Sequence, residues 1–348
     1  MNNSPVDIVY FYPQGHEKHF EIGHPERPDR VEAIKDELRA NGLWEAFPKV
    51  PPTEIPEPVL FNIHTEAYIE HMQAAHDKRR PRGMVELDTF LTSESWRLAL
   101  NAAGGALSVA SQVWNGEARA GFSLSRPPGH HATPHNAMGF CLLNNIALAA
   151  EYLLQVHQAG KLAIIDIDLH HGNGTQDIFW QRNDVFFISV HQLPLYPMTG
   201  YINQTGAGAG ENATLNIPFP PNSGDQARQT ALENIILPVL DRIKPEMLLI
   251  SAGFDAHWKD PLGSQLASAR GCGQLVSGLR NWADQNCMGK IMLSLEGGYD
   301  LEGTAASALS ATQALLGLDI SDRLGPSPTP EKDHWQETIK EVTSIWGL

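Results

Sequence analysis

The chain has 348 residues, of which 42% are hydrophobic and 19% charged, so it can bury a sizeable core and has the composition of an ordinary globular protein. Its formal net charge is −15 and its longest basic run is only Lys78-Arg79-Arg80, so nucleic acid is not an expected partner. No apolar stretch approaches about 18 residues, no charged and apolar leader precedes the first predicted strand, and the three cysteines lack CxxC spacing, so we expect a cytoplasmic protein without a membrane partner.

Short apolar runs alternate with longer amphipathic segments along the chain. Helical patterns are clearest at 27–40, which begins after Pro25 and ends at Gly42, and at 65–76, where Thr65 can cap the helix. This alternation predicts an α/β fold with a mostly parallel sheet and helices on both of its faces. Strands are predicted at residues 6–12, 120–125, 162–168, 185–191, 213–219, 247–252 and 290–295.

Two segments depart from this alternation. Residues 48–58 contain five prolines and are predicted to form an irregular surface connection rather than a domain linker. Near the end of the chain, apolar residues at helical spacing predict a helix at about 330–346 that docks on the domain or on a second subunit. The sequence therefore leaves open whether the protein forms a homo-oligomer. The residues that carry this pattern are Trp335, Ile339, Val342 and Trp346.

Carboxylates and an imidazole follow the predicted strand at 162–168. Residues two apart share one face of a strand, so at about 3.3 Å per residue the Cα atoms of Asp168 and His170 lie roughly 6–7 Å apart. The strand at 247–252 leads to Asp255, which reaches the same edge if the two strands are parallel neighbours. A lone Asp at a strand end is more often a cap or turn residue, but this cluster would be unstable if it were buried without a cation. Three protein ligands leave a fourth position for water or substrate.

Two further predicted strand ends carry groups suited to amide chemistry. Residues 126–131 form a turn that paired prolines make rigid, and the turn presents His130 and His131 side by side. A neutral His can accept the proton of an attacking water and later donate it to a leaving group, and Asp166 is well placed as the carboxylate partner of one of the pair. After 290–295, a Gly-Gly turn places Tyr299 at the same edge, where its phenol can donate to a developing oxyanion.

These motifs, in this order, resemble the histone deacetylase family, which also includes acetylpolyamine amidohydrolases and acetoin-utilisation proteins. The resemblance covers residues 6–316 and rests on four separate motifs. It implies one deacetylase domain over residues 1–348, with a three-layer α/β/α arginase/deacetylase-type fold, an eight-stranded mostly parallel sheet and zinc-dependent amide hydrolysis. By position, the resemblance makes Asp168, His170 and Asp255 the zinc ligands.

The resemblance also implies roles for the residues around the metal. His131 would be the general base and then the general acid, His130 with Asp166 would give electrostatic support, and Tyr299 would donate to the oxyanion. A structural potassium ion would be held by Asp166, Asp168, His170, Ser189 and Val190. An acyl-lysine tunnel, with Arg30 near its inner end, would be lined by Asp88 at the rim, Gly139, Phe140, Tyr196, Leu262 and Gly298.

Marks of the subfamily narrow the expected substrate. Asn173 and the run 251–257 are similar to the class II branch of the family. Polyamine-specific relatives often carry Glu after an Asp-Pro pair, where this chain has Leu262, so we expect an acyl-lysine protein or peptide as substrate, with a small acylated amine as the alternative. Because one imidazole and two carboxylates form a hard ligand set, Fe²⁺ is an alternative to Zn²⁺.

Two other functions remain open from the sequence. A binuclear ureohydrolase shares the fold class, and Asp255-Ala256-His257 superficially matches its motif, but a second metal needs more ligands than these motifs provide. Two bound metals per chain instead of one would identify it. The other alternative is a non-enzymatic acyl-group reader. Intact His130, His131 and Tyr299 argue against it, and turnover of an acetyl-lysine peptide would decide.

Overall fold

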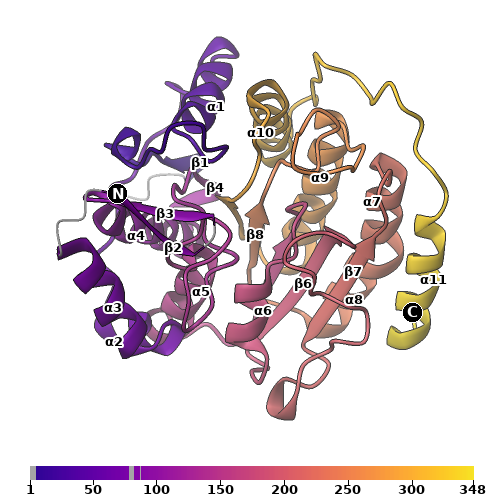
Figure 1. Cartoon of the computed structure of the whole chain (residues 1–348). Coiled ribbons are helices and arrows are strands. Elements are labelled where there is room, and N and C mark those ends of the chain that lie inside the picture. The colour runs from indigo at the N-terminus through magenta and orange to yellow at the C-terminus, as the bar shows by residue number, and fades with distance from the viewer. Residues whose placement is uncertain (1–4, 78–81, 87) are drawn as a thin grey trace.

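A seven-stranded parallel sheet forms the centre of the protein (Figure 1). The computed structural model describes residues 5–77, 82–86 and 88–348, so the basic run at 78–80 lies outside the described residues. In spatial order the strands are β1-β4-β9-β8-β5-β6-β7, and every neighbouring pair is parallel. Their bounds are close to those predicted: β1 Val6–Phe11, β4 Ala118–Ser123, β5 Leu162–Asp166, β6 Val185–Gln192, β7 Thr214–Phe219, β8 Leu248–Ala252 and β9 Ile291–Leu295.

The fold class is as predicted, but the described sheet has one strand fewer than the eight implied by the resemblance. Beside edge strand β1, the chain makes a single parallel bridge, in which Tyr10 N donates to Pro48 O at 3.0 Å and Val50 N donates to Tyr10 O at 2.8 Å. The prolines that follow Val50 lack the N–H groups needed to extend this bridge into a strand. The remaining described strands, β2 Arg82–Glu86 and β3 Thr89–Thr92, pair with each other in a separate antiparallel hairpin.

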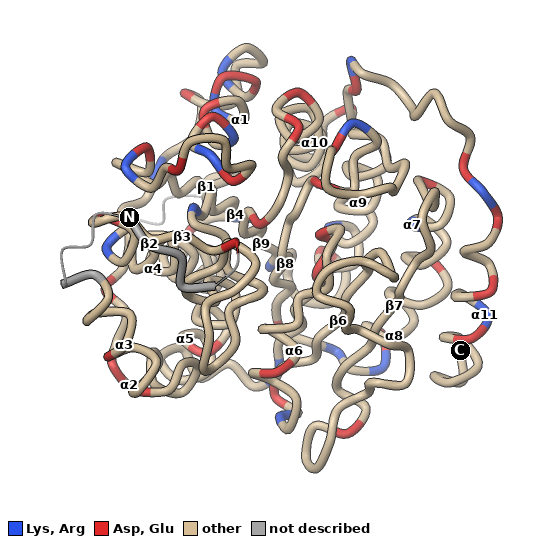
Figure 2. Tube along the Cα trace, in the orientation of Figure 1, with Lys and Arg blue, Asp and Glu red and all other residues tan. Residues whose placement is uncertain are grey.

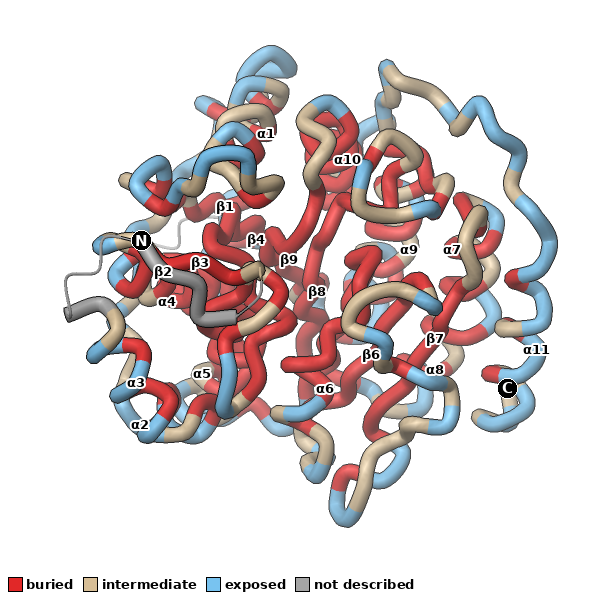
Figure 3. The backbone as a smooth tube through the Cα atoms, in the orientation of Figure 1, coloured by how far each residue is buried: buried red, intermediate tan, exposed pale blue. Residues whose placement is uncertain are grey.

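Helices cover both faces of the sheet, so its strands are buried (Figure 3), and the buried hydrophobic side chains form two main cores. Neighbouring residues of one strand enter different cores, as Ile164 and Ile165 do, which explains why the strands are continuous apolar runs. One face packs against α2 Glu57–Ile63, α3 Glu66–Asp77, α4 Ser95–Trp114, α5 Asn145–Val156 and α6 Asn173–Phe179. The other packs against α1 Asp29–Ala40, α7 Asp225–Ala231, the π-helical turn Leu232–Ile236, α8 Leu237–Ile243, α9 Ala269–Asn286, α10 Leu301–Leu316 and α11 Trp335–Trp346.

Charged residues lie mostly on the outer helices and loops (Figure 2). Among the described residues, no helix is both long enough and apolar enough to span a bilayer. The helices begin at side-chain caps where the sequence provides them: Asn144 accepts from Ala147 N at α5, and Ser268 accepts from Gly271 N at α9. These caps fix where the helices start, just beyond the loops that carry the site.

The C-terminal helix docks on the domain itself, which was one of the two predicted alternatives. It contacts β7, and Trp335, Ile339 and Val342 are buried. The segment before it runs along the outside of the domain (Figure 1), and Glu331 in this segment accepts hydrogen bonds from three backbone N–H groups at the start of α7. The last helix therefore covers the edge strand β7. Whether the protein forms a homo-oligomer stays a prediction.

We expect Val342→Ala to lower the free energy of unfolding by about 2 kcal/mol, because it removes two methyl groups from a fully buried position. Urea denaturation measures the change. Ile345→Ala is the matched control, because Ile345 lies on the same helix and is 49% exposed, so its effect should be small. Equal effects of the two substitutions would contradict the docked position of α11.

Candidate active site

Four neighbouring strands deliver the predicted site residues to one edge of the sheet. In the order β4-β9-β8-β5 they are all parallel, so their carboxyl ends lie side by side. The loop after β4 carries the paired histidines, the turn after β5 carries Asp168 and His170, the loop after β8 carries Asp255, and the turn after β9 carries Tyr299. Groups that are up to about 170 positions apart in the chain thus converge because of strand order alone.

Asp168, His170 and Asp255 form a compact group of potential metal ligands. All three are buried, and one ligand atom from each lies within 4.8 Å of the others. His170 Nδ1 is 3.2 Å from Asp168 Oδ1 and 3.0 Å from Asp255 Oδ2. Within the described residues, the only other such group is His130, Cys141 and Glu296.

The convergence of these ligands has a different cause from the one predicted. Strand β5 ends at Asp166, so Asp168 and His170 lie in the turn beyond it and are not aligned by the strand. Instead, Asp166 Oδ1 accepts from Asp168 N at 3.1 Å, and Asp168 Oδ1 accepts from His170 N at 2.9 Å. Each acidic side chain thus folds the backbone two residues ahead, as Asp residues commonly do in turns.

The surroundings of the group fit a cation. A Cβ atom at Gly253 would overlap the carboxylate of Asp168, and one at Gly297 would overlap the carboxylate of Asp255, so both positions require glycine. Burial raises the pKa of Asp255, and the negative charge of Asp168 raises it further. One imidazole nitrogen and two carboxylate oxygens are donors that a divalent ion such as Zn²⁺ or Fe²⁺ accepts.

The paired histidines differ in their hydrogen-bond partners. His130 Nδ1 donates to Asp166 Oδ2 at 2.9 Å, as the sequence predicted for one of the pair. His131 Nδ1 donates instead to the amide oxygen of Asn173 at 2.8 Å. The sequence indicated Asn173 only as a mark of the subfamily. The structure shows that its side chain holds the ring of His131 through this hydrogen bond.

These partners separate the two histidines electrostatically. Burial by itself lowers the pKa of His130, but the charges of Asp166 and Asp168 outweigh burial and raise that pKa to about 10. Burial lowers the pKa of His131 well below 6.5, and positive charge on His130 and His170 lowers it further. His131 is therefore a neutral base at neutral pH, and it also lines the cavity described next.

A cavity of about 240 Å³ leads to His131 and His170. The lining of this cavity includes five residues that were predicted for the tunnel. It also includes Leu195, to which the sequence did not point. Gly298 was predicted to line the tunnel but is not among the lining residues, and its carbonyl accepts a hydrogen bond from the buried Arg30 Nε. The predicted residues that line the cavity are Asp88, Gly139, Phe140, Tyr196 and Leu262, together with His131, His170 and Tyr299.

Tyr299 is held between a cation and an aromatic ring at the wall of this cavity. The guanidinium carbon of Arg30 lies 4.9 Å from the centre of the Tyr299 ring, and the ring of Phe140 meets it edge-on at 5.7 Å. Burial raises the pKa of Tyr299 well above 10, so its phenol keeps its proton and can donate a hydrogen bond. Arg30 packs against Tyr299 and does not itself line the cavity, so its place near the inner end of a tunnel stays a prediction.

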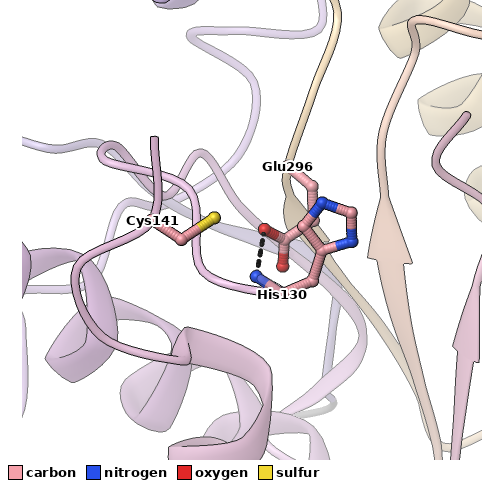
Figure 4. A group of neighbouring side chains, drawn as sticks. All are labelled: His130, Cys141 and Glu296. Atoms are coloured by element: carbon pink, nitrogen blue, oxygen red, sulfur yellow. Dashed lines mark hydrogen bonds between the residues drawn. The ribbon is translucent and has the colours of Figure 1, made fainter. Parts of the chain in front are cut away.

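Glu296 organises the histidine loop and was missed by sequence reasoning. Figure 4 shows its carboxylate turned toward the backbone of His130, and Glu296 Oε2 accepts from Gly129 N at 2.6 Å and from His130 N at 3.0 Å. The neighbouring Cys141 Sγ donates to Gly139 O. Because the polar groups of this second cluster have partners within the protein, we assign no metal to it. The sequence signal that could have revealed Glu296 is its position, because it is an acidic residue directly before the Gly-Gly-Tyr turn.

The predicted potassium ligands also lie together at the end of β5. Asp166 pairs with Ser189 across strands β5 and β6, and Val190 follows Ser189. The hydroxyl of Ser189 contacts His191 Nδ1 at 2.9 Å. The potassium ion and the roles of individual residues stay predictions.

Comparison with known proteins identifies the family. Residues 24–315 match the histone deacetylase domain. The chain belongs to the histone deacetylase family. It is therefore a deacetylase-type hydrolase, as its relatives are named, and this family is generally metal-dependent.

Similar proteins come from archaea, bacteria and plants. A probable deacetylase of Archaeoglobus fulgidus is 39% identical over 301 residues, which is 86% of this chain and 83% of the relative. The histone deacetylase-like amidohydrolase of Pseudomonas aeruginosa is 33% identical over 338 residues, which is 94% of this chain and 88% of the relative. A crystal structure of the HDA15 HD domain superposes with a TM-score of 0.89 at 32% identity, covering 99% of this chain and 94% of that one.

Replacing one ligand tests the metal site. We expect Asp255→Ala to lose both the bound metal and turnover while keeping the fold, because two ligands hold a divalent ion far less well than three. Metal analysis of the purified protein, with circular dichroism as a check on folding, measures this, and wild type should contain one equivalent. Asp284→Ala, an exposed carboxylate on α9, is the control. A full metal equivalent with normal turnover in Asp255→Ala would reject the assignment.

Proposed function

We propose that this protein is a zinc-dependent amidohydrolase that removes acyl groups, acetyl first among them, from the ε-amine of lysine side chains. The observation that carries this proposal is the cavity of about 240 Å³, because a metal ligand, a neutral imidazole and a protonated phenol all line it. An extended acyl-lysine side chain entering past Phe140 would bring its carbonyl to these groups.

The three cavity groups divide the work of amide hydrolysis. The chemistry that a bound Zn²⁺ or Fe²⁺ would supply at Asp168, His170 and Asp255 is polarisation of the acyl carbonyl and acidification of water. His131 takes a proton from water as its oxygen bonds to the acyl carbon, and it returns this proton to the amine when the C–N bond breaks. The immediate products are a free amine and a carboxylic acid, which gives up its proton at neutral pH.

The remaining polar groups support these steps. The phenol of Tyr299 donates to the oxyanion that develops on the acyl oxygen. His130, which is hydrogen-bonded to Asp166, provides a positive charge behind His131. Positive charge at His130 keeps the pKa of His131 low, and it becomes more effective as negative charge develops on the substrate.

We also propose a structural K⁺ at the end of β5, because the resemblance to the family implies this ion. Asp166 is fully buried and pairs with Ser189 across strands β5 and β6. Oxygens of Asp166, Ser189 and Val190, with oxygens of Asp168 and His170, would hold the ion, and His130 would share in balancing the charge of Asp166.

The mouth of the cavity favours peptides over polyamines. Leu262 presents an apolar side chain there, so a secondary ammonium group would lose water without gaining a charged partner. Asp88 at the rim offers a carboxylate that can accept from the backbone N–H groups of a bound peptide. A small acylated amine is the alternative substrate class.

We further propose that residues 1–348 form one deacetylase domain. We also propose that the protein is cytoplasmic, because all three of its cysteines are unpaired.

Substitution of the two histidines should give unequal losses. We expect His131→Ala to reduce kcat by at least about 10²–10⁴-fold on an acetyl-lysine peptide, because the same imidazole serves as base and then as acid. His130→Ala should reduce kcat less. His135→Ala, an exposed histidine in the same loop region, is the matched control. If His131→Ala kept near-normal kcat while His130→Ala abolished turnover, the two roles would be reversed.

A charge at the cavity mouth should shift substrate preference. We expect Leu262→Glu to raise kcat/KM for acetylspermidine relative to an acetyl-lysine peptide, since a carboxylate would attract the ammonium by about 1–4 kcal/mol. Competition between the two substrates measures the ratio. Leu318→Glu, at a 49% exposed position that does not line the cavity, should leave it unchanged. A wild-type enzyme that strongly prefers acetylpolyamines, unaltered by Leu262→Glu, would overturn the substrate assignment.

A further inference from the structure

Asp260 is a buried carboxylate that bridges two walls of the cavity. It lies in the loop between β8 and α9 and is only 7% exposed. Its Oδ1 accepts from Leu262 N at 3.0 Å, and its Oδ2 accepts from Tyr299 N at 2.6 Å and from Asp300 N at 3.1 Å. One side chain therefore holds the backbone of a residue at the cavity mouth and the backbone of the phenol donor.

We propose that Asp260 is a positioning residue that sets the place of the Tyr299 phenol relative to the substrate held at Leu262. This inference rests on the proposed function, because it concerns the same cavity and the same reaction. Asp260 is not among the residues that line the cavity, so it acts through Tyr299 and not on the substrate.

The turn that carries Tyr299 needs external support. Gly298 has a φ of +120°, a conformation that side chains rarely adopt, and residues 296–300 lie between β9 and α10, outside any strand or helix. Before this glycine, Gly297 N donates to Asp168 Oδ2 at 2.8 Å. After it, the N–H groups of Tyr299 and Asp300 both donate to Asp260. The turn is thus tied to a metal ligand at one end and to Asp260 at the other.

A carboxylate is the group that fits this position. Both of its oxygens accept hydrogen bonds, one toward Leu262 and the other toward Tyr299. An Asn side chain has the same shape but only one accepting atom. It can therefore accept from Leu262 N or from the N–H groups of Tyr299 and Asp300, but not from both, and the donor on the other side then faces an NH₂ group. Asp260→Asn therefore removes the connection with little change in volume.

Asp322 provides a matched control for the loss of such hydrogen bonds. Its carboxylate also accepts from three backbone N–H groups, those of Arg270, Leu324 and Gly325, at 2.9–3.1 Å. It does not line the cavity. Asp322→Asn should therefore reproduce any general effect on stability without moving Tyr299.

The test is a double-mutant cycle with Tyr299→Phe, measured as kcat and KM on an acetyl-lysine peptide. We expect Asp260→Asn to retain its metal and to lower kcat about 10- to 100-fold, the scale that a displacement of roughly 1 Å produces, with a smaller effect on KM. In the Tyr299→Phe background the same substitution should cost less than about 3-fold, because the group that it positions is gone. Losses that multiply independently in the double variant would overturn the proposal, as would equal effects of Asp260→Asn and Asp322→Asn.

Amide hydrogen exchange tests the same connection without any substrate. In Asp260→Asn, exchange should become faster on the wall that loses its acceptor, either at Leu262 or at Tyr299 and Asp300, while β9 stays protected, and in Asp322→Asn it should not change at these residues. Unchanged exchange at Leu262, Tyr299 and Asp300 would count against the proposal. Should Asp260→Asn not fold, Asp260→Glu keeps the charge but displaces both oxygens, and it serves in the same measurements. A wild-type protein that holds metal but turns over no acyl-lysine peptide would refute the proposed function, whereas the exchange result would still decide the role of Asp260.

Discussion

The burial of carboxylates at the carboxyl edge of the sheet is the constraint on which the rest of the site depends. Asp166, Asp168 and Asp255 lie where four parallel strands end, away from solvent, so their charges must be met by hydrogen bonds and cations. Backbone N–H groups meet part of this need, because Leu169 N donates to Asp255 Oδ1 and Gly297 N to Asp168 Oδ2. His170 Nδ1 lies 3.2 Å from Asp168 Oδ1 and 3.0 Å from Asp255 Oδ2, so a nitrogen and two carboxylate oxygens meet at a point that a metal ion could occupy.

The same constraint explains the glycines and the turns around the site. Gly253 and Gly297 follow two of the strands at positions where a Cβ atom would occupy the space of a ligand carboxylate. The backbone can therefore approach the acidic groups closely enough to donate to them.

A second pattern is the use of buried acids to hold catalytic loops in place. Glu296 fixes the backbone of the histidine loop, Asp166 fixes the ring of His130, and Asp260 holds the turn of Tyr299. Burial raises the pKa of Glu296 to about 7, and burial together with the charge of Asp255 raises that of Asp260 to about 7. Neither group lines the cavity, yet each holds the backbone of a residue for which we propose a role in the reaction.

The sequence by itself determined the fold class, the strand positions and most of the site, because parallel strands are apolar runs and the reactive residues follow directly after them. It could not determine the sheet size, since the prolines after Val50 end a bridge whose partner, β1, lies far away in the chain. It also did not reveal that side-chain hydrogen bonds in a turn, and not the strand, align Asp168 with His170. The roles of Asn173, Glu296 and Asp260 were decided only by the tertiary structure, because each depends on a partner more than 35 positions away, and sequence periodicity describes neighbours alone.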